Sequence, residues 1–178
     1  QFDDKNLLSK FIDRRNLPVT VVRYINGLFL DEDYKFISAN EVDNVLASDL
    51  GDLIGKPCLC SSGGGGVERY TYSGAGYFRH DGTKVSSRFI SKLGYSSYIV
   101  QKKIEQAAFP ASFNPPSVNT LRMMTLRCPW NGEMVVLKTM LRMGVTNDIV
   151  DNMMKGGLCV NVGDDGALLK YGYDYNGK

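Results

Sequence analysis

The pattern of hydrophobic and polar positions divides the chain into many short elements, most of them typical of β-strands. Residues 19–25 are rich in β-branched side chains, and Asn26-Gly27 then predicts a tight turn into a second strand. Asn131-Gly132 is the same kind of turn between two longer strands. The strands expected along the chain span 19–25, 28–30, 53–58, 67–72, 76–78, 98–104, 120–128, 134–143, 158–162 and 167–169.

Helical patterns are fewer and shorter. Leu7, Leu8, Phe11 and Ile12 have the spacing of one helical face. Ser38 and Glu41 form a capping-box pair before Val42, and a third helix is expected over 84–93. These elements predict an α+β fold made of antiparallel sheets with few helices.

Composition narrows the class of protein. The 178 residues are 43% hydrophobic and 22% charged, which is typical of a folded domain and excludes a disordered chain. The net charge of +2 is too small for a general nucleic-acid binder. No apolar run reaches the length of a membrane span, and charged residues within 1–20 exclude a signal peptide. We therefore expect a cytoplasmic protein with reduced cysteines, no membrane span and no nucleic-acid partner.

One lysine and one glycine loop are the first candidates for chemistry. Lys56 lies within the apolar strand 53–58, where a buried ammonium needs an anionic partner, although a lysine on an edge strand can also reach solvent. The loop that follows contains Gly63, Gly64, Gly65 and Gly66, which suit either a plain hairpin tip or a cradle for phosphate. The spacing fits neither a Walker A nor a Rossmann motif, and in a protein kinase the glycine loop would precede the lysine.

Two arginines are the next candidates. Arg122 and Arg142 each interrupt an apolar strand of the predicted hairpin, and a guanidinium in that position is usually paired or faces a ligand. On adjacent strands the two could lie on one face, although a plain surface position is the alternative. Asn119 precedes Arg122 by three residues, so in a regular strand their side chains point to opposite faces.

Taken together, these segments resemble an ATP-grasp protein, and most closely the sugar-transfer-associated branch that is related to α-L-glutamate ligases. The resemblance covers roughly residues 50–165 and is specific because the segments come in the family's order. The N-terminal stretch 5–18 is also similar to the segment that precedes this domain. The matching segments are IGKP at 54–57, SGGGGV at 62–67, YIVQKKIEQ at 98–106, SVNTLR at 117–122, LRMG at 141–144, VDN at 150–152 and GG at 156–157.

The resemblance implies a role for each matching residue. Lys56 would contact the α- and β-phosphates of ATP under a lid made of Gly63 to Gly66. Arg122 and Arg142 would be catalytic, neutralising the β- and γ-phosphates and a developing acyl phosphate. Other cofactor-binding residues would be Gln101, Lys102, Lys103 and Ile104, with the backbone of 102–104 on adenine, Glu105 on the ribose and Asn119 on phosphate. Asp151 and Asn152 are weaker candidates for holding Mg²⁺.

The family pattern also implies an activity and an organisation. It predicts residues 1–48 as a preceding helix and strand region, 49–106 as an N-terminal ATP-grasp lobe with lid and hinge, and 107–178 as a partial C-terminal lobe. The family's Glu-x-Asn metal segment does not occur in this sequence, so we expect the ATP-grasp fold to be truncated at its C-terminal end. The implied reaction is ATP-dependent ligation of a small carboxylate to an amine or sugar acceptor through an acyl phosphate, in cell-surface polysaccharide biosynthesis. The alternatives are a non-catalytic nucleotide- or glycan-binding module and a plain β-rich interaction domain.

Overall fold

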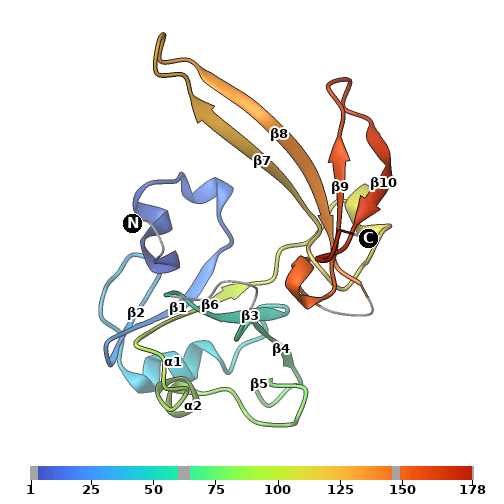
Figure 1. Ribbon diagram of the computed structural model, residues 1–178. Coiled ribbons are helices and arrows are strands. Elements are labelled where there is room, and N and C mark those ends of the chain that lie inside the picture. The colour runs from blue at the N-terminus through green and yellow to red at the C-terminus, as the bar shows by residue number, and fades with distance from the viewer. Residues whose placement is uncertain (1–3, 60–64, 146–148, 178) are drawn as a thin grey trace. The chain divides into compact units, whose positions relative to one another are not determined.

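The computed structural model describes residues 4–59, 65–145 and 149–177. The chain divides into two compact units, Gln1–Ile104 and Glu105–Lys178, which are described separately below as unit 1 and unit 2. Each unit is built on one antiparallel sheet with short helices (Figure 1). The predicted α+β class is therefore confirmed.

Unit 1 contains a six-stranded antiparallel sheet of strand order β2-β1-β6-β3-β4-β5. The turn between the first two strands is the predicted one, because Asn26 and Gly27 both adopt positive φ, 48° and 88°. Residues 1–48 and 49–106 of the predicted division both contribute strands to this sheet. Its strands are β1 (Thr20–Ile25), β2 (Leu28–Leu30), β3 (Leu53–Pro57), β4 (Glu68–Tyr72), β5 (Tyr77–Phe78) and β6 (Ser97–Lys102).

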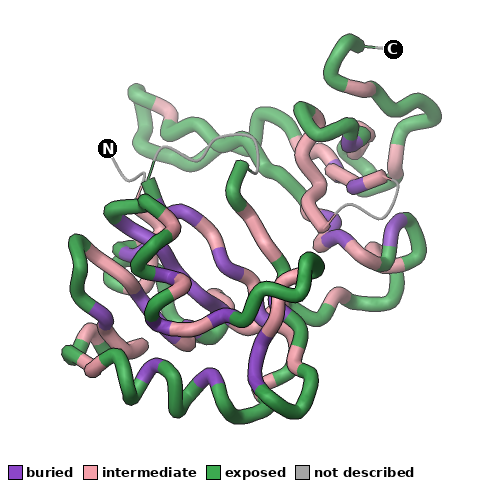
Figure 2. The backbone as a smooth tube through the Cα atoms, turned by 90° about the horizontal axis from the view of Figure 1, so that it is seen from below, coloured by how far each residue is buried: buried purple, intermediate pink, exposed green. Residues whose placement is uncertain are grey.

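One face of this sheet carries the hydrophobic core. Helices α1 (Ala39–Val45) and α2 (Ser87–Ser91) lie on that side (Figure 1). The capping box at the start of α1 is present, since the Ser38 and Glu41 side chains each bond the other's backbone. Residues of β1, β3, β4 and β6 face these helices, and Figure 2 marks the buried positions in purple. The core comprises Val22, Phe29, Val42, Leu46, Leu53, Tyr70, Tyr77, Val85, Ile90, Tyr98 and Val100.

The opposite face of the sheet is covered by the N-terminal segment. This segment forms two 3₁₀ helices, η1 (Lys5–Lys10) and η2 (Arg14–Asn16), where a helix with one apolar face was predicted. The helix forms, but its apolar residues do not contribute to a core: Leu7, Phe11 and Ile12 are exposed, whereas Asn6 is fully buried. Asn6 is buried because it makes polar contacts with two strands of the sheet. Arg23 donates to the Asn6 carbonyl at 2.9 Å, and the Asn6 amide donates to Ser97 Oγ at 2.9 Å.

Unit 2 contains a four-stranded antiparallel sheet of strand order β10-β9-β8-β7. Its two longest strands form the hairpin predicted around Asn131-Gly132, and the Cys128 N–H donates to the Glu133 carbonyl at its end, at 2.7 Å. Most side chains of this hairpin are exposed. The elements of unit 2 are α3 (Ala108–Ala111), β7 (Thr120–Arg127), β8 (Met134–Met143), η4 (Met153–Lys155), β9 (Leu158–Val162) and β10 (Leu168–Tyr173).

Candidate functional site

The alternation of β3 directs Lys56 away from the core. Leu53, Gly55 and Pro57 are buried, while Ile54 and Lys56 are half-buried. The register then places Lys56 opposite Ile99 of β6, and Ile99 opposite Arg23 of β1. Directly opposed residues share a face, so Arg23 and Lys56 flank Ile99 on one face, about 10 Å apart at two strand spacings.

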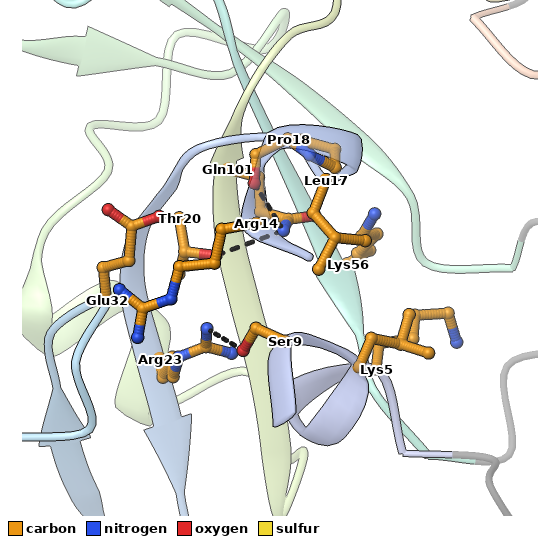
Figure 3. Close-up of a pocket in the computed structure, with 11 residues that line it drawn as sticks. Lys5, Ser9, Arg14, Leu17, Pro18, Thr20, Arg23, Glu32, Lys56 and Gln101 are labelled. Atoms are coloured by element: carbon orange, nitrogen blue, oxygen red, sulfur yellow. Dashed lines mark hydrogen bonds between the residues drawn. The ribbon is translucent and has the colours of Figure 1, made fainter. Parts of the chain in front are cut away.

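A pocket of about 210 Å³ lies on this face, between the sheet and the N-terminal segment. Figure 3 shows Lys56, Gln101, Thr20 and Arg23 reaching it from the strands. The remaining lining residues come from the segment over the sheet and from the loop after β2: Lys5, Leu8, Ser9, Arg14, Leu17, Pro18 and Glu32. Two of the predicted ATP-binding residues, Lys56 and Gln101, are therefore brought together here.

The electrostatics of the pocket favour an anion. Burial lowers the pKa of Lys56, and the nearby ammonium of Lys5 lowers this pKa further. Among the described residues, no carboxylate forms an ion pair with Lys56. Arg23 is only 1% exposed, and burial lowers its pKa as well. Buried cations of this kind are stabilised by a bound anion.

The segment predicted to hold adenine lies at the end of β6. Two of its backbone N–H groups are already engaged, since Lys102 donates to the Val19 carbonyl at 2.9 Å and Lys103 to the Asp52 carbonyl at 2.8 Å. Ile104 is 47% exposed and Glu105 is also exposed. The boundary between the two units falls between Ile104 and Glu105, in the segment where a hinge was predicted.

Only part of the glycine loop can be described. Gly63 and Gly64 lie outside the described residues, while Gly65 and Gly66 are exposed in a turn. Gly66 has φ of +71°, and a Cβ there would lie 2.7 Å from both a Pro57 ring carbon and the Tyr95 hydroxyl. The positive φ and these two close side chains therefore account for glycine at position 66.

In unit 2 the two arginines share a face of the sheet. Thr120 lies opposite Arg142, and Arg122 is two residues further along β7, opposite Met140. The Arg142 guanidinium donates to Thr120 Oγ1 at 3.0 Å and lies 3.2 Å from Asp151 Oδ2. Thr120 also donates to Asp151 through a short hydrogen bond. Arg142 is thus fixed in place, whereas Arg122 is exposed and has no ion pair within the described ranges.

Three further predicted residues are engaged within unit 2. Asn119 is 6% exposed, and its amide group makes hydrogen bonds to four neighbouring groups. Asn152 caps η4 by accepting from the Met154 N–H at 2.8 Å, and Asp151 is paired with Arg142. No group of three metal-ligating His, Cys, Asp or Glu side chains occurs among the described residues. Asp151 and Asn152 are thus engaged by neighbouring protein groups, and their role in holding Mg²⁺ stays a prediction.

Sequence reasoning missed Arg23 in the pocket of unit 1, and Cys159 and Lys138 beside the arginines of unit 2. Arg23 interrupts the apolar strand 20–25, which is the same signal that singled out Lys56 and Arg122. Cys159 lies opposite Arg142 in the sheet. Its thiol is influenced by the charges of Arg142, Asp151, Arg122 and Lys138. Lys138 is therefore a third cation on the face that carries the two arginines. A cation within an apolar strand would have identified both Arg23 and Lys138.

Comparison with known families gives one match that covers nearly the whole chain. The model of the sugar-transfer associated ATP-grasp family matches residues 1–176. The chain belongs to this family. The suspected ATP-grasp branch is thereby confirmed, and the two antiparallel sheets are consistent with an ATP-grasp fold. No curated protein and no solved structure matches the chain. Every helix within the described ranges is too short or too polar to cross a lipid bilayer.

Proposed function

We propose that this ATP-grasp chain is the ATP-binding part of a ligase that joins a small carboxylate to an amine or sugar acceptor, in the biosynthesis of a cell-surface polysaccharide. The observation that carries the proposal is Lys56, a half-buried ammonium in a cation-lined pocket where no carboxylate pairs with it among the described residues. A group in this environment is stabilised by phosphate oxygens. Family membership adds ATP as the expected source of those phosphates.

The proposed roles divide between the units. In unit 1, Lys56 binds the α- and β-phosphates, residues 63–66 act as a lid, and the backbone of 102–104 contacts adenine with Glu105 at the ribose. In unit 2, Arg122 and Arg142 bind the β- and γ-phosphates. Thr120 and Asp151 hold the Arg142 guanidinium in a fixed direction, which favours recognition of a phosphate oxygen. Asn119 contributes indirectly, by shaping the start of β7. No step is assigned to magnesium through Asp151 or Asn152.

The proposed chemistry has two steps. A carboxylate oxygen of the acid substrate attacks the γ-phosphorus in line, the bond to the bridging oxygen breaks, and ADP leaves. The two arginines stabilise the charge on the transferring phosphoryl group. The acceptor nitrogen or oxygen then attacks the acyl carbon, loses its proton and expels phosphate. Closure of the glycine loop would exclude water from the acyl phosphate.

Calorimetric titration with a non-hydrolysable ATP analogue tests the proposal. Lys56→Met removes the ammonium and keeps most of the side-chain volume, and we expect roughly 10–100-fold weaker binding because charged hydrogen bonds contribute about 1.5–3 kcal/mol. Lys92→Met is the matched control, since Lys92 is exposed next to α2, the helix on the other face of the sheet. Equal affinity of the Lys56→Met protein and the parent would contradict the proposed role.

A second assay tests the acyl-phosphate step. Hydroxylamine captures acyl phosphates as hydroxamates, so incubation with ATP, hydroxylamine and a mixture of small organic acids should yield hydroxamate and release phosphate. Arg142→Met should abolish the signal while leaving analogue binding measurable. A protein that binds the analogue but forms no hydroxamate with any acid would instead support a non-catalytic nucleotide-binding module.

A further inference from the structure

The pocket of unit 1 has more positive charge than a single lysine contact requires. Four of its lining residues are cationic and one, Glu32, is a carboxylate that forms no ion pair with them. Arg14 also pairs with Asp33 at 2.6 Å, and Asp33 is exposed and does not line the pocket. For Arg23 and Lys56, no ion pair is found among the described residues.

Arg23 is the least compensated of these cations. Its terminal nitrogens donate to neutral oxygens only, those of Asn6 and Ser9, at 2.9–3.3 Å. Its Nε has no hydrogen-bond partner although it is buried, and its guanidinium lies over the Tyr34 ring, 4.2 Å from the centroid. The charge of Glu32 acts on this guanidinium without an ion pair or hydrogen bond between them. A fully buried guanidinium with no paired carboxylate is unfavourable, and an anion in the adjacent pocket would reduce that penalty.

The pocket is large enough for a small organic anion but too small for a whole nucleotide. Its volume of about 210 Å³ is below the roughly 300–1,000 Å³ of pockets that hold drug-sized ligands. Leu8, Leu17 and Pro18 supply apolar surface on the side of the N-terminal segment, while the floor is polar, with Thr20 and Gln101. Gln101 already donates to Thr20 Oγ1 at 3.2 Å and to the Pro18 carbonyl at 3.3 Å, so its amide orientation is fixed (Figure 3).

We propose that this pocket binds a small organic carboxylate, which is the acid substrate of the ligase if the proposed function holds. The carboxylate group lies toward Lys56 and Arg23, and the hydrocarbon part packs under Leu8, Leu17 and Pro18. Residues 5–18 thereby form a substrate-binding cover on the sheet. Because Lys56 also lines this pocket, it would lie between the acid and the α- and β-phosphates of ATP.

Amide chemical-shift titrations on the ¹⁵N-labelled chain test this inference. The probes are butyrate, glutarate and glutamate, with butanamide as the neutral analogue, inorganic phosphate as the competing oxyanion and a non-hydrolysable ATP analogue as the nucleotide. We expect saturable shifts at Ser9, Thr20 and Gln101 with the acids and none with butanamide. The Lys5→Gln/Arg14→Gln double variant should weaken acid binding at least tenfold and nucleotide binding less than twofold.

Controls keep the result interpretable if a variant unfolds. Arg88→Gln is the matched control, because it changes an exposed arginine on α2, across the sheet from the pocket, and should change nothing. Arg23→Met is informative only where its amide spectrum matches the parent, and should then abolish acid binding.

The outcomes separate this inference from the proposed function. Acid binding at these amides without nucleotide binding would support the pocket and overturn the ATP role. Nucleotide binding without any acid binding would overturn the pocket alone. Inorganic phosphate that displaces the acids at equal concentration, or variants that weaken the nucleotide as much as the acids, would show a phosphate site and overturn the carboxylate assignment.

Discussion

Asn119 joins three segments of unit 2, so its replacement by alanine should destabilise that unit strongly. Its Oδ1 accepts from Ser117 Oγ at 2.7 Å and from the Gly144 N–H at 3.0 Å. Its Nδ2 donates to the carbonyls of Pro110 at 2.7 Å and Asn114 at 3.2 Å. These contacts connect the end of α3, the loop before β7 and the residue after β8.

The size of the effect follows from these four hydrogen bonds. Each contributes about 1 kcal/mol net, and removal of one partner leaves buried groups such as the Gly144 N–H without an acceptor. We therefore expect Asn119→Ala to lower the free energy of unfolding of unit 2 by about 3–4 kcal/mol. This is a large share of the ~5–15 kcal/mol by which a typical protein is stable.

Hydrogen exchange followed by mass spectrometry is the suitable assay. The one tryptophan, Trp130, is 89% exposed, so its fluorescence should report little on unfolding. Peptides from β7 and β8 should exchange about 10²–10³-fold faster in Asn119→Ala, since each 1.4 kcal/mol corresponds to a factor of ten. Peptides from the sheet of unit 1 should be unchanged, and Asn176→Ala, at an exposed position of unit 2, is the matched control.

The same protein distinguishes a fold role from direct contact with phosphate. If Asn119 acts by holding these segments, nucleotide affinity should fall only in proportion to the loss of folded unit 2. Unchanged exchange in β7 and β8 together with at least tenfold weaker nucleotide binding would refute this reasoning and favour direct contact.

Two further predictions concern unit 1. Burial raises the pKa of the Cys58 thiol to about 11, against 9.0 for an ordinary thiol. Cys58 should therefore resist alkylation at pH 8 until the protein unfolds. Its contribution to the free energy of unfolding, measured by urea denaturation, should fall by about 3 kcal/mol as the pH rises from 9 through 11. Gly55→Ala should destabilise by about 1–3 kcal/mol, because a Cβ would overlap the Tyr70 and Tyr98 hydroxyls, and adding Tyr98→Phe should recover part of this loss.

The Cys58 thiol makes the folded state less stable as the pH rises. Between pH 9 and 11 the unfolded thiol loses its proton while the folded thiol keeps it, so the folded state binds more protons and its stability decreases as pH rises. A Cys58→Ser protein should show a smaller decrease, and the part that remains comes from the buried Tyr70 and Tyr98 hydroxyls, whose pKa values burial also raises. Alkylation of folded parent protein at pH 8 at the rate of a free thiol would contradict the assigned burial.

The elements that could be predicted from the sequence are those fixed by neighbours along the chain. Asn26-Gly27 and Asn131-Gly132 set two hairpins, because positive φ at these turns is a local property. Ser38 and Glu41 set the start of α1 for the same reason. The buried residue of the N-terminal helix, Asn6, could not be predicted, because its burial depends on a hydrogen bond from Arg23, seventeen residues away on β1. Local periodicity contains no information about that contact.

In the candidate site, too, local features could be predicted from the sequence and long-range contacts could not. A cation inside an apolar strand marked Lys56, Arg122 and Arg142 as candidates, but only the register of β7 and β8 places the two arginines on one face. Which cations meet one another depends on register between strands. Arg23 and Lys56 are thirty-three positions apart, and only their common pairing with Ile99 brings them to one pocket.

This dependence on register gives the pocket a consequence for substrate choice. The floor of the pocket is fixed by the sheet, whose strands hold Arg23, Gln101 and Lys56 at set spacings. The cover consists of two 3₁₀ helices held mainly by polar contacts from Asn6 and Ser9 to Arg23. Substitutions at Leu8, Arg14 or Leu17 can therefore alter the size and charge of the pocket without disturbing the core on the opposite face. On this reasoning the proposed ATP contacts are set by the strands, and selectivity among acids is set by residues 5–18.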